Sequence, residues 1–257
     1  MGTARDEAVS QIEAYLRRTL LAMDAGEHWV TVNAGSKTGG EGGGSHVMLD
    51  GEGREGLCRI ASVGKQSASL ELMSEKLHAR PASSVVLAVG WGKEARRGWI
   101  LEKSVELEAE GLWFWQAERS QFPVPSDAKE TWHASLVAGA KQCRNPWLPK
   151  LQTLPGGVDD LIRASAEFEH CHVLVESGLP QQDFMSSQYL GLPGRTLCVI
   201  GPEGGFSTRE IEKLMTAGFS ALSMGDRVLR WETAAMMALG LHWWQRQSPS
   251  RQNGGEA

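Results

Sequence analysis

One segment of the sequence combines residue types that suit a ligand site with a position that suits one. It reads Ile200-Gly201-Pro202-Glu203-Gly204-Gly205-Phe206-Ser207 and lies between an apolar run of strand length and a helical pattern. In open α/β proteins, ligands bind at the carboxyl ends of parallel strands. Gly204 and Gly205 permit positive φ angles and close approach of a ligand to the backbone, while Pro202 stiffens the turn. These features predict a site lined by backbone groups.

The helix that follows has clear signals at both ends. Ser207 and Glu210 have the spacing of a capping box, in which each side chain bonds the backbone N–H of the other residue. Gly218 is placed to end the helix. The start of this helix, and with it the end of the glycine-rich segment, is therefore well specified.

A second segment has the same arrangement. It reads Ser223-Met224-Gly225-Asp226-Arg227-Val228-Leu229-Arg230-Trp231-Glu232-Thr233-Ala234-Ala235, so that a glycine turn follows a strand candidate and leads into a helix. Arginine at a helix start opposes the helix macrodipole, which indicates another role for Arg227 and Arg230. Loops after adjacent parallel strands lie at one edge of a sheet, and we expect both segments to face one crevice.

Three weaker motifs are interpreted as structural. Gly51, Gly53 and Gly56 match G-x-G-x-x-G, but residues 57–63 read as a strand where a dinucleotide site requires a helix. Residues 35–38 (GSKT) lack the spacing of a phosphate loop. His170-Cys171-His172 leads into an apolar strand, whose neighbouring side chains point to opposite faces. We therefore expect no metal site, and the four scattered cysteines indicate free thiols in a reducing compartment.

The elements before residue 81 predict a small, mostly β domain. We expect a helix over residues 6–23, a short strand over 28–33, a mobile glycine-rich loop over 33–45, and strands over 47–49, 57–63 and 67–72.

From residue 84, apolar strands alternate with helices, which favours a parallel sheet covered on both faces. The strand candidates are 85–89, 112–115, 172–176, 196–200 and 221–224, and the helix candidates are 93–107, 128–143, 158–168, 208–217 and 232–245. Residues 248–257 are polar and predict a disordered tail.

Composition excludes several classes of protein. The 257 residues carry a net charge of −5 and are 41% hydrophobic, which argues against wholesale disorder and against a strongly basic nucleic-acid footprint. Neither the part before Pro81 nor the part after it is basic, so any RNA binding must come from local charge. The absence of an apolar run near 18 residues predicts a soluble, cytoplasmic protein.

With both loops in view, the sequence resembles the RsmE family of ribosomal RNA uracil-N3 methyltransferases, which belong to the SPOUT class. Residues 200–207 match that family's GPEGGFS motif without a change, and residues 224–235 resemble its L-G-x-R-I-L-R-x-E-T-A motif. Three further segments are similar to the family. Residues 102–107 resemble its QKATEL helix, and residues 118–120 resemble the ERS that follows it. Residues 142–143 with Pro149 resemble its Q-S/C-x-R…P element. The sequence departs from the family pattern at three places. Trp231 stands where the family has a small residue or threonine, and Glu108 stands where it has glycine. Arg144-Asn145 replaces the order that the family has before Pro149.

The resemblance implies a fold that periodicity does not. It implies a SPOUT-type trefoil-knotted parallel sheet domain over residues 81–247, preceded by a PUA-like RNA-binding β domain over 1–80 with an atypical N-terminus. Periodicity alone predicts an ordinary doubly wound sheet, because chains generally avoid threading.

The resemblance also implies a cofactor, S-adenosylmethionine, and the residues that hold it. These are Val175, Gly201, Pro202, Glu203, Gly204, Leu222, Met224, Gly225, Val228 and Leu229, with Glu176 completing the wall. We expect Arg230 to stabilise charge that develops on the uracil oxygens. Glu232 and Glu203 are the candidate carboxylates for proton transfer or for orienting that arginine, and the choice between them stays open.

The implied partners are ribosomal RNA of the small (16S) subunit and a second copy of the chain, with residues 234–244 suited to a homodimer interface. The candidates for RNA contact are Arg17, Arg18, Lys93, Arg96, Arg97, Arg119, Lys141 and Arg144. The alternatives are a non-catalytic or differently targeted RNA-binding relative and a nucleotide-dependent oxidoreductase.

Overall fold

The computed structural model describes residues 30–32, 45–63, 68–92, 96–176, 183–184 and 191–247. The predicted helix over 6–23, most of the loop over 33–45 and the tail over 248–257 lie outside these ranges, as do Arg17, Arg18 and Lys93. The chain forms two compact units. One comprises Met1–Arg80 with Val137–Leu148, and the other comprises Pro81–Leu136 with Pro149–Ala257.

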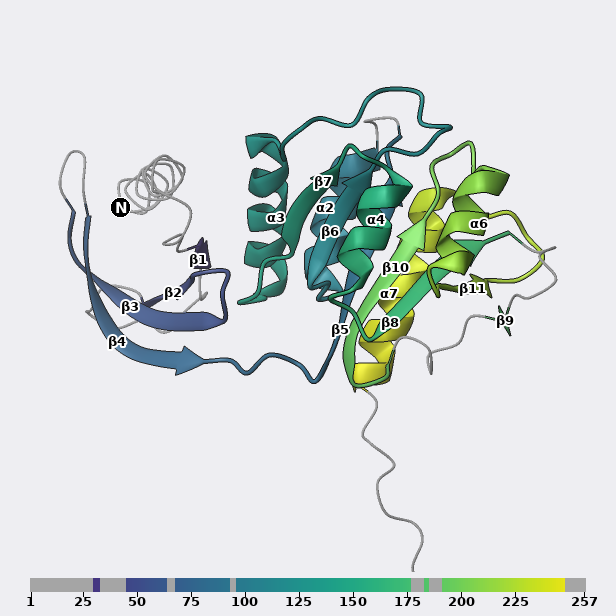
Figure 1. The fold of residues 1–257 in the computed structure, drawn as a ribbon. Coiled ribbons are helices and arrows are strands. Elements are labelled where there is room, and N and C mark those ends of the chain that lie inside the picture. The colour runs from purple at the N-terminus through teal and green to yellow at the C-terminus, as the bar shows by residue number, and fades with distance from the viewer. Residues whose placement is uncertain are drawn as a thin grey trace, which may run out of the picture. The chain divides into compact units, whose positions relative to one another are not determined.

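The first unit contains an antiparallel sheet in the order β1-β2-β3-β4 (Figure 1). Its strands are β1 (Val30–Val32), β2 (Ser45–Leu49), β3 (Arg54–Val63) and β4 (Ala68–Leu77), so β3 and β4 are longer than predicted. Gly51 and Gly53 have positive φ angles of 78° and 97°, and a strand follows them. This confirms that the G-x-G-x-x-G match is a hairpin turn.

Residues 137–148 belong to this first unit, whereas the sequence analysis assigned them to the second domain. Gly53 donates its N–H to the Pro146 carbonyl at 3.0 Å, and the Trp147 ring fills the space where a Gly53 Cβ would lie. Val137 packs against Leu49. The sequence does not indicate that residues 137–148 belong to the first unit, because the contacts that place them there join residues about 90 positions apart.

The second unit is built on a parallel sheet in the order β7-β6-β5-β10-β8-β11-β9. The predicted parallel sheet is therefore confirmed. Its strands are β5 (Ser83–Gly90), β6 (Gly111–Trp115), β7 (Lys150–Leu154), β8 (His170–Val175), β9 (Asp183–Phe184), β10 (Gly194–Ile200) and β11 (Ser220–Ser223). The prediction missed β7 and β9, which lie at the two edges of the sheet. There β7 is half exposed and polar, and β9 is only two residues long.

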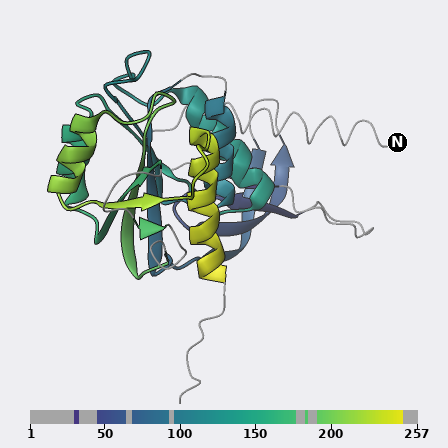
Figure 2. The ribbon, with the colours of Figure 1, turned by 90° about the vertical axis from the view of Figure 1, so that its right-hand side faces the viewer.

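Helices cover both faces of this sheet, as predicted. They are α2 (Arg97–Glu106), α3 (Glu130–Cys143), α4 (Val158–Ser165), α6 (Thr208–Thr216) and α7 (Trp231–Gln247). Figure 2 shows α4 and α6 on one side of the strands and α7 on the other. Leu161 of α4 and Leu214 of α6 are fully buried with Trp115, Val173 and Leu197 in one apolar core. No helix in the described ranges is long and apolar enough to span a membrane.

The strand order differs from that of an ordinary doubly wound sheet. After β8 the chain reaches β9 at the edge, returns to form β10 between β5 and β8, and then passes β8 again to form β11. The carboxyl ends of β10 and β11 therefore flank the end of β8. This order positions the two glycine-rich loops on either side of Val175.

Candidate functional site

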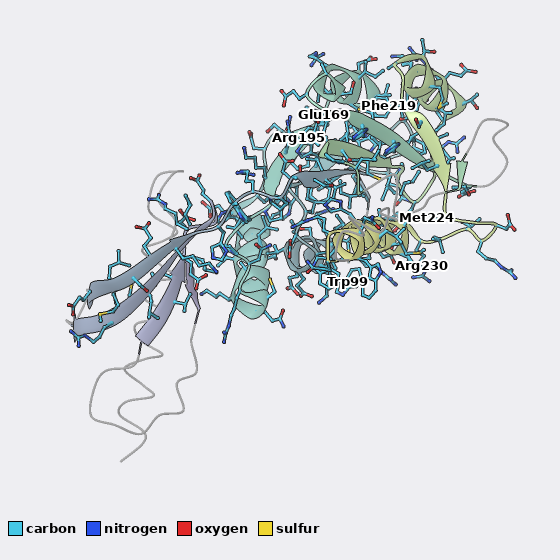
Figure 3. The ribbon with its side chains drawn as sticks, turned by 90° about the horizontal axis from the view of Figure 1, so that it is seen from below. Trp99, Glu169, Arg195, Phe219, Met224 and Arg230 are labelled. Carbon is cyan, nitrogen blue, oxygen red and sulfur yellow. The ribbon has the colours of Figure 1, made fainter. Side chains whose placement is uncertain are left out.

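The two glycine-rich segments line one cavity of about 660 Å³ at the carboxyl ends of β10, β8 and β11. Both segments therefore face a shared space, as the sequence predicts. Figure 3 labels Met224 and Arg230 on the second of the two loops. The lining residues are Arg96, Arg119, Leu174, Val175, Glu176, Ile200, Gly201, Pro202, Glu203, Gly204, Gly205, Phe206, Ile211, Met224, Gly225, Arg227, Val228, Leu229, Arg230, Trp231, Glu232 and Ala234.

The capping box after the first loop is confirmed. Ser207 Oγ accepts a hydrogen bond from the Glu210 N–H at 3.1 Å, and Glu210 Oε2 accepts one from the Ser207 N–H at 2.7 Å. The other oxygen of Glu210 accepts the Glu118 N–H at 2.8 Å. This buried carboxylate therefore joins the start of α6 to the loop after β6, which is a contact that the sequence did not indicate.

Trp115, at the end of β6, supports both ends of the first loop. Its indole N–H donates to the Ile200 carbonyl at 3.0 Å, and its ring stacks against Phe206 with 5.7 Å between centroids. The strand register of β5, β6 and β10 brings Trp115 beside the first loop.

Close backbone contacts also hold the first loop. A Cβ on Gly90, the last residue of β5, would lie only 2.3 Å from the Pro202 nitrogen. Gly205 has a φ of 70°. Arg119 donates from Nη1 to the Gly204 carbonyl at 3.0 Å. The sequence analysis did not single out Gly90, whose only signal was a glycine at the end of an apolar strand.

The second loop has fewer contacts within the described residues. Ser223 Oγ lies 3.2 Å from the Gly225 N–H and 3.3 Å from the Gly225 carbonyl, and Gly225 has a φ of 112°. Val228 is 73% exposed, and Arg227 and Arg230 are exposed as well. An apolar side chain left in solvent beside a cavity is one that a ligand can cover.

The structure brings together nine of the ten residues expected to hold a cofactor. Leu222 is the exception, because it is fully buried in β11 and does not line the cavity. Its side chain belongs to the core behind the site, and its contact with the cofactor stays a prediction. Glu176 lines the cavity as expected. The nine are Val175, Gly201, Pro202, Glu203, Gly204, Met224, Gly225, Val228 and Leu229.

The three candidate catalytic residues, Arg230, Glu232 and Glu203, also line the cavity. Glu232 is buried in the first turn of α7, and its carboxylate forms an ion pair with the Arg96 guanidinium. Glu203 is exposed and accepts the indole N–H of Trp231 at 3.4 Å. The Glu232 carboxylate therefore has a positively charged partner, whereas the Glu203 carboxylate has a neutral one.

The candidates for RNA contact fall into different environments. Arg96 and Arg119 line the cavity, Lys141 is half buried, and Arg144 is exposed. Arg97 is buried, and its guanidinium lies 3.7 Å from the Trp91 ring centroid and donates to the Gly92 carbonyl at 2.9 Å. We correct Arg97 to a packing residue, because its charged group is covered by aromatic rings.

No group of three metal-ligating side chains occurs among the described residues. His172 is buried in the sheet, and His170 Nε2 lies 3.1 Å from the Pro193 carbonyl. Burial raises the pKa of the Cys171 thiol to about 11 and that of Cys198 to about 12. Both thiols are therefore protonated at neutral pH and are poor metal ligands in this state.

A family model described as an RNA methyltransferase domain matches residues 79–243, which include both loops and the whole cavity. The chain belongs to this family. Its similarity to the RsmE family, read first from the motifs, is confirmed by curated relatives. For example, the ribosomal RNA small subunit methyltransferase E of Bacillus subtilis is 27% identical over 202 residues, which cover 75% of this chain and 78% of the relative.

Solved structures show the same fold as this RNA methyltransferase family member. A methyltransferase of Legionella pneumophila, solved with bound S-adenosylmethionine, matches with a TM-score of 0.68 and 27% identity over 79% of this chain and 84% of that one. A ribosomal RNA small subunit methyltransferase E of Neisseria gonorrhoeae matches with a TM-score of 0.64 at 20% identity, over 89% and 87% of the two chains. The SPOUT-type fold class, a parallel sheet domain with a separate antiparallel sheet, is thereby confirmed.

Proposed function

We propose that this family member is an S-adenosylmethionine-dependent methyltransferase that modifies N3 of a uridine in small-subunit ribosomal RNA. The observation that carries the proposal is that both motif loops line one cavity at the carboxyl end of the sheet. The names of the curated relatives support the RNA substrate, and the cofactor in the Legionella structure supports the methyl donor. A ribosomal substrate also implies action in the cytoplasm.

The cavity fits S-adenosylmethionine by its chemistry. Four glycines, Gly201, Gly204, Gly205 and Gly225, expose backbone N–H and C=O groups that can pair with an adenine edge. Apolar side chains at Val175, Val228 and Leu229 can cover the flat face of a base. No lysine occurs in the described lining, which agrees with a cofactor that carries no phosphate. When bound there, the cofactor supplies an electrophilic methyl group.

The chain's own residues supply position and charge. Holding the uracil nitrogen in line with the methyl carbon converts a bimolecular step into an effectively intramolecular one. As N3 loses its proton, negative charge develops on the flanking uracil oxygens, and Arg230 is placed in the cavity wall to stabilise it. Arg119 and Arg227 share the wall with Arg230, and these three guanidinium groups can contact phosphates of an RNA substrate in spite of the acidic total charge.

We also propose a second copy of the chain as partner. Trp99 of α2 and Met237 and Trp244 of α7 are 46%, 42% and 65% exposed on helices that contact each other. Figure 3 shows Trp99 beside α7. Large apolar side chains gathered on one surface are typical of homodimer interfaces. Sedimentation at micromolar concentration tests this, and a monomer for the wild type contradicts it.

Nucleoside mass spectrometry of 16S ribosomal RNA from a deletion strain tests the reaction. We expect loss of N3-methyluridine in the deletion strain and its return when the wild-type gene is supplied. An Arg230→Ala gene should fail to restore the modification, although the purified variant should bind S-adenosylhomocysteine nearly as well as the wild type. An unchanged N3-methyluridine content in the deletion strain contradicts the proposed substrate, and full restoration by Arg230→Ala removes Arg230 from the mechanism.

A further inference from the structure

The two carboxylates in the cavity are held in different ways. Glu232 is only 5% exposed, and its carboxylate is neutralised by the Arg96 guanidinium. It also lies in the first turn of α7, where the helix macrodipole favours a negative charge. A carboxylate that is buried, paired and stabilised by a dipole has a structural role in the cavity wall. Removing its partner would leave an uncompensated buried charge.

Glu203 lies in the opposite situation. It is exposed at the turn of the first loop, and none of the described lysines and arginines forms an ion pair with it. Its described partner is the indole N–H of Trp231, at 3.4 Å from Oε1. An indole is a neutral donor, so it orients the carboxylate and leaves its negative charge uncompensated.

Trp231 is the feature that sets this chain apart from the family pattern, in which the position holds a small residue or threonine. This residue is buried, with 8% of its surface exposed, and it is the first residue of α7, directly after the second loop. A buried tryptophan usually finds a partner for its N–H, and here that partner belongs to the first loop. The indole thus joins the two loops through a single contact inside the cavity wall.

We infer that Trp231 is a positioning residue for Glu203, and that Glu203, not Glu232, is the carboxylate that accepts the N3 proton of the substrate base. This rests on the proposed function. As N3 forms its bond to the methyl carbon, the bond from that carbon to sulfur breaks and the electron pair stays on sulfur. The N3 proton passes to the Glu203 carboxylate as the new bond forms, so that the negative charge on the flanking uracil oxygens is transient, and the proton then moves to water.

The test uses the full-length protein and S-adenosylmethionine, with small ribosomal subunits from the deletion strain as substrate. We compare Glu203→Gln, Trp231→Phe, the double variant and Glu232→Gln, and measure turnover against pH, affinity for S-adenosylhomocysteine, and thermal stability. Glu203→Gln should lower turnover about 100-fold, the lower end of what a general base contributes, and should abolish the acidic limb of the pH profile. The Glu232→Gln variant should keep that limb and lose thermal stability.

The double variant separates positioning from packing. Trp231→Phe should lower turnover about tenfold by releasing Glu203, and it should have no further effect in the Glu203→Gln background. Should Trp231→Phe fold poorly, Glu203→Gln still decides, because its side chain is exposed. Additive losses, or an acidic limb retained in Glu203→Gln, overturn the inference. A wild type that binds no S-adenosylhomocysteine and transfers no methyl group instead overturns the proposed function.

Discussion

The two loops that form the cavity differ in how the rest of the second unit holds them. Trp115, Arg119 and Glu210 bond the first loop or the turn that follows it, and Gly90 packs directly on its backbone. The second loop has fewer such contacts among the described residues: Ser223 bonds Gly225, and Trp231 at the start of α7 bonds Glu203, while Val228 stays in solvent. One wall of the site is therefore fixed by the fold, while the other depends on what it binds.

This difference has a consequence for binding. A wall that is already in place costs little to order when a ligand arrives, whereas an exposed loop gains its contacts from the ligand itself. We expect substitutions that disturb the first loop to reduce both stability and affinity, and substitutions of apolar cavity residues in the second loop to reduce affinity alone. The following variants test this division, in order of decreasing effect.

Glu210→Ala should have the largest effect on stability. It removes the acceptor for the Ser207 and Glu118 N–H groups in a buried place, and we expect a loss of about 2–4 kcal/mol in the free energy of unfolding. Urea denaturation measures it. Glu212→Ala, an exposed change on the same helix, is the control and should stay within about 0.5 kcal/mol. Equal effects for the two variants would show that the capping carboxylate does not hold the loop.

Gly90→Ala should displace the first loop. The new Cβ meets the Pro202 backbone, and overpacking of this kind costs about 1–3 kcal/mol. We expect affinity for S-adenosylhomocysteine to fall about tenfold or more, measured by calorimetry. Gly98→Ala on α2, where a Cβ meets nothing within 4 Å, is the matched control and should bind normally. Wild-type affinity in Gly90→Ala is incompatible with a loop fixed against β5.

Trp115→Phe should have a smaller effect of the same kind. The ring remains, but the Ile200 carbonyl loses its indole donor, which costs about 1–2 kcal/mol of stability and lowers affinity several-fold. Trp113→Phe, in the same buried strand and core, provides the comparison for lost volume alone. If both variants weaken affinity equally, the hydrogen bond to Ile200 does not support the site.

Val228→Ser should change affinity without changing stability. The side chain is exposed in the free protein, so unfolding should be unaffected within about 0.5 kcal/mol. A ligand that covers it should lose about 1 kcal/mol, or about fivefold in affinity. Phe122→Ser, an exposed apolar change outside the cavity, should leave both unchanged. An unaltered affinity in Val228→Ser would place the ligand away from the second loop.

The parts of the site that sequence could predict are those whose signals are local. Ser207 and Glu210 are three residues apart, and the two glycine turns each follow an apolar strand, so the loops and their shared edge followed from pattern and spacing. The partners of Trp115 and Arg97 could not be predicted, because tertiary contacts set them. Trp115 bonds a carbonyl 85 residues away. Arg97 is covered by the rings of Trp91, directly after β5, Phe114 of β6 and Trp132 of α3.

The fold shows the same limit. Central strands such as β5 and β10 contain continuous apolar runs and were predicted to within two residues at each end, but the polar edge strand β7 has no such signal. The return of the chain between β5 and β8 came only from the family resemblance, because periodicity carries no information about strand order. Leu222, which that same resemblance assigns to the cofactor, has a side chain buried in the core, which the resemblance does not indicate.

Hydrogen exchange measured by mass spectrometry, with and without saturating S-adenosylhomocysteine, tests most directly whether one fixed and one ligand-dependent loop enclose the adenosyl group. Residues 225–230 should exchange quickly in the free protein and gain strong protection with the ligand, while residues 201–206 should be protected already and change little. Protection that appears elsewhere, or no change in either loop at saturation, would contradict a cofactor site between them.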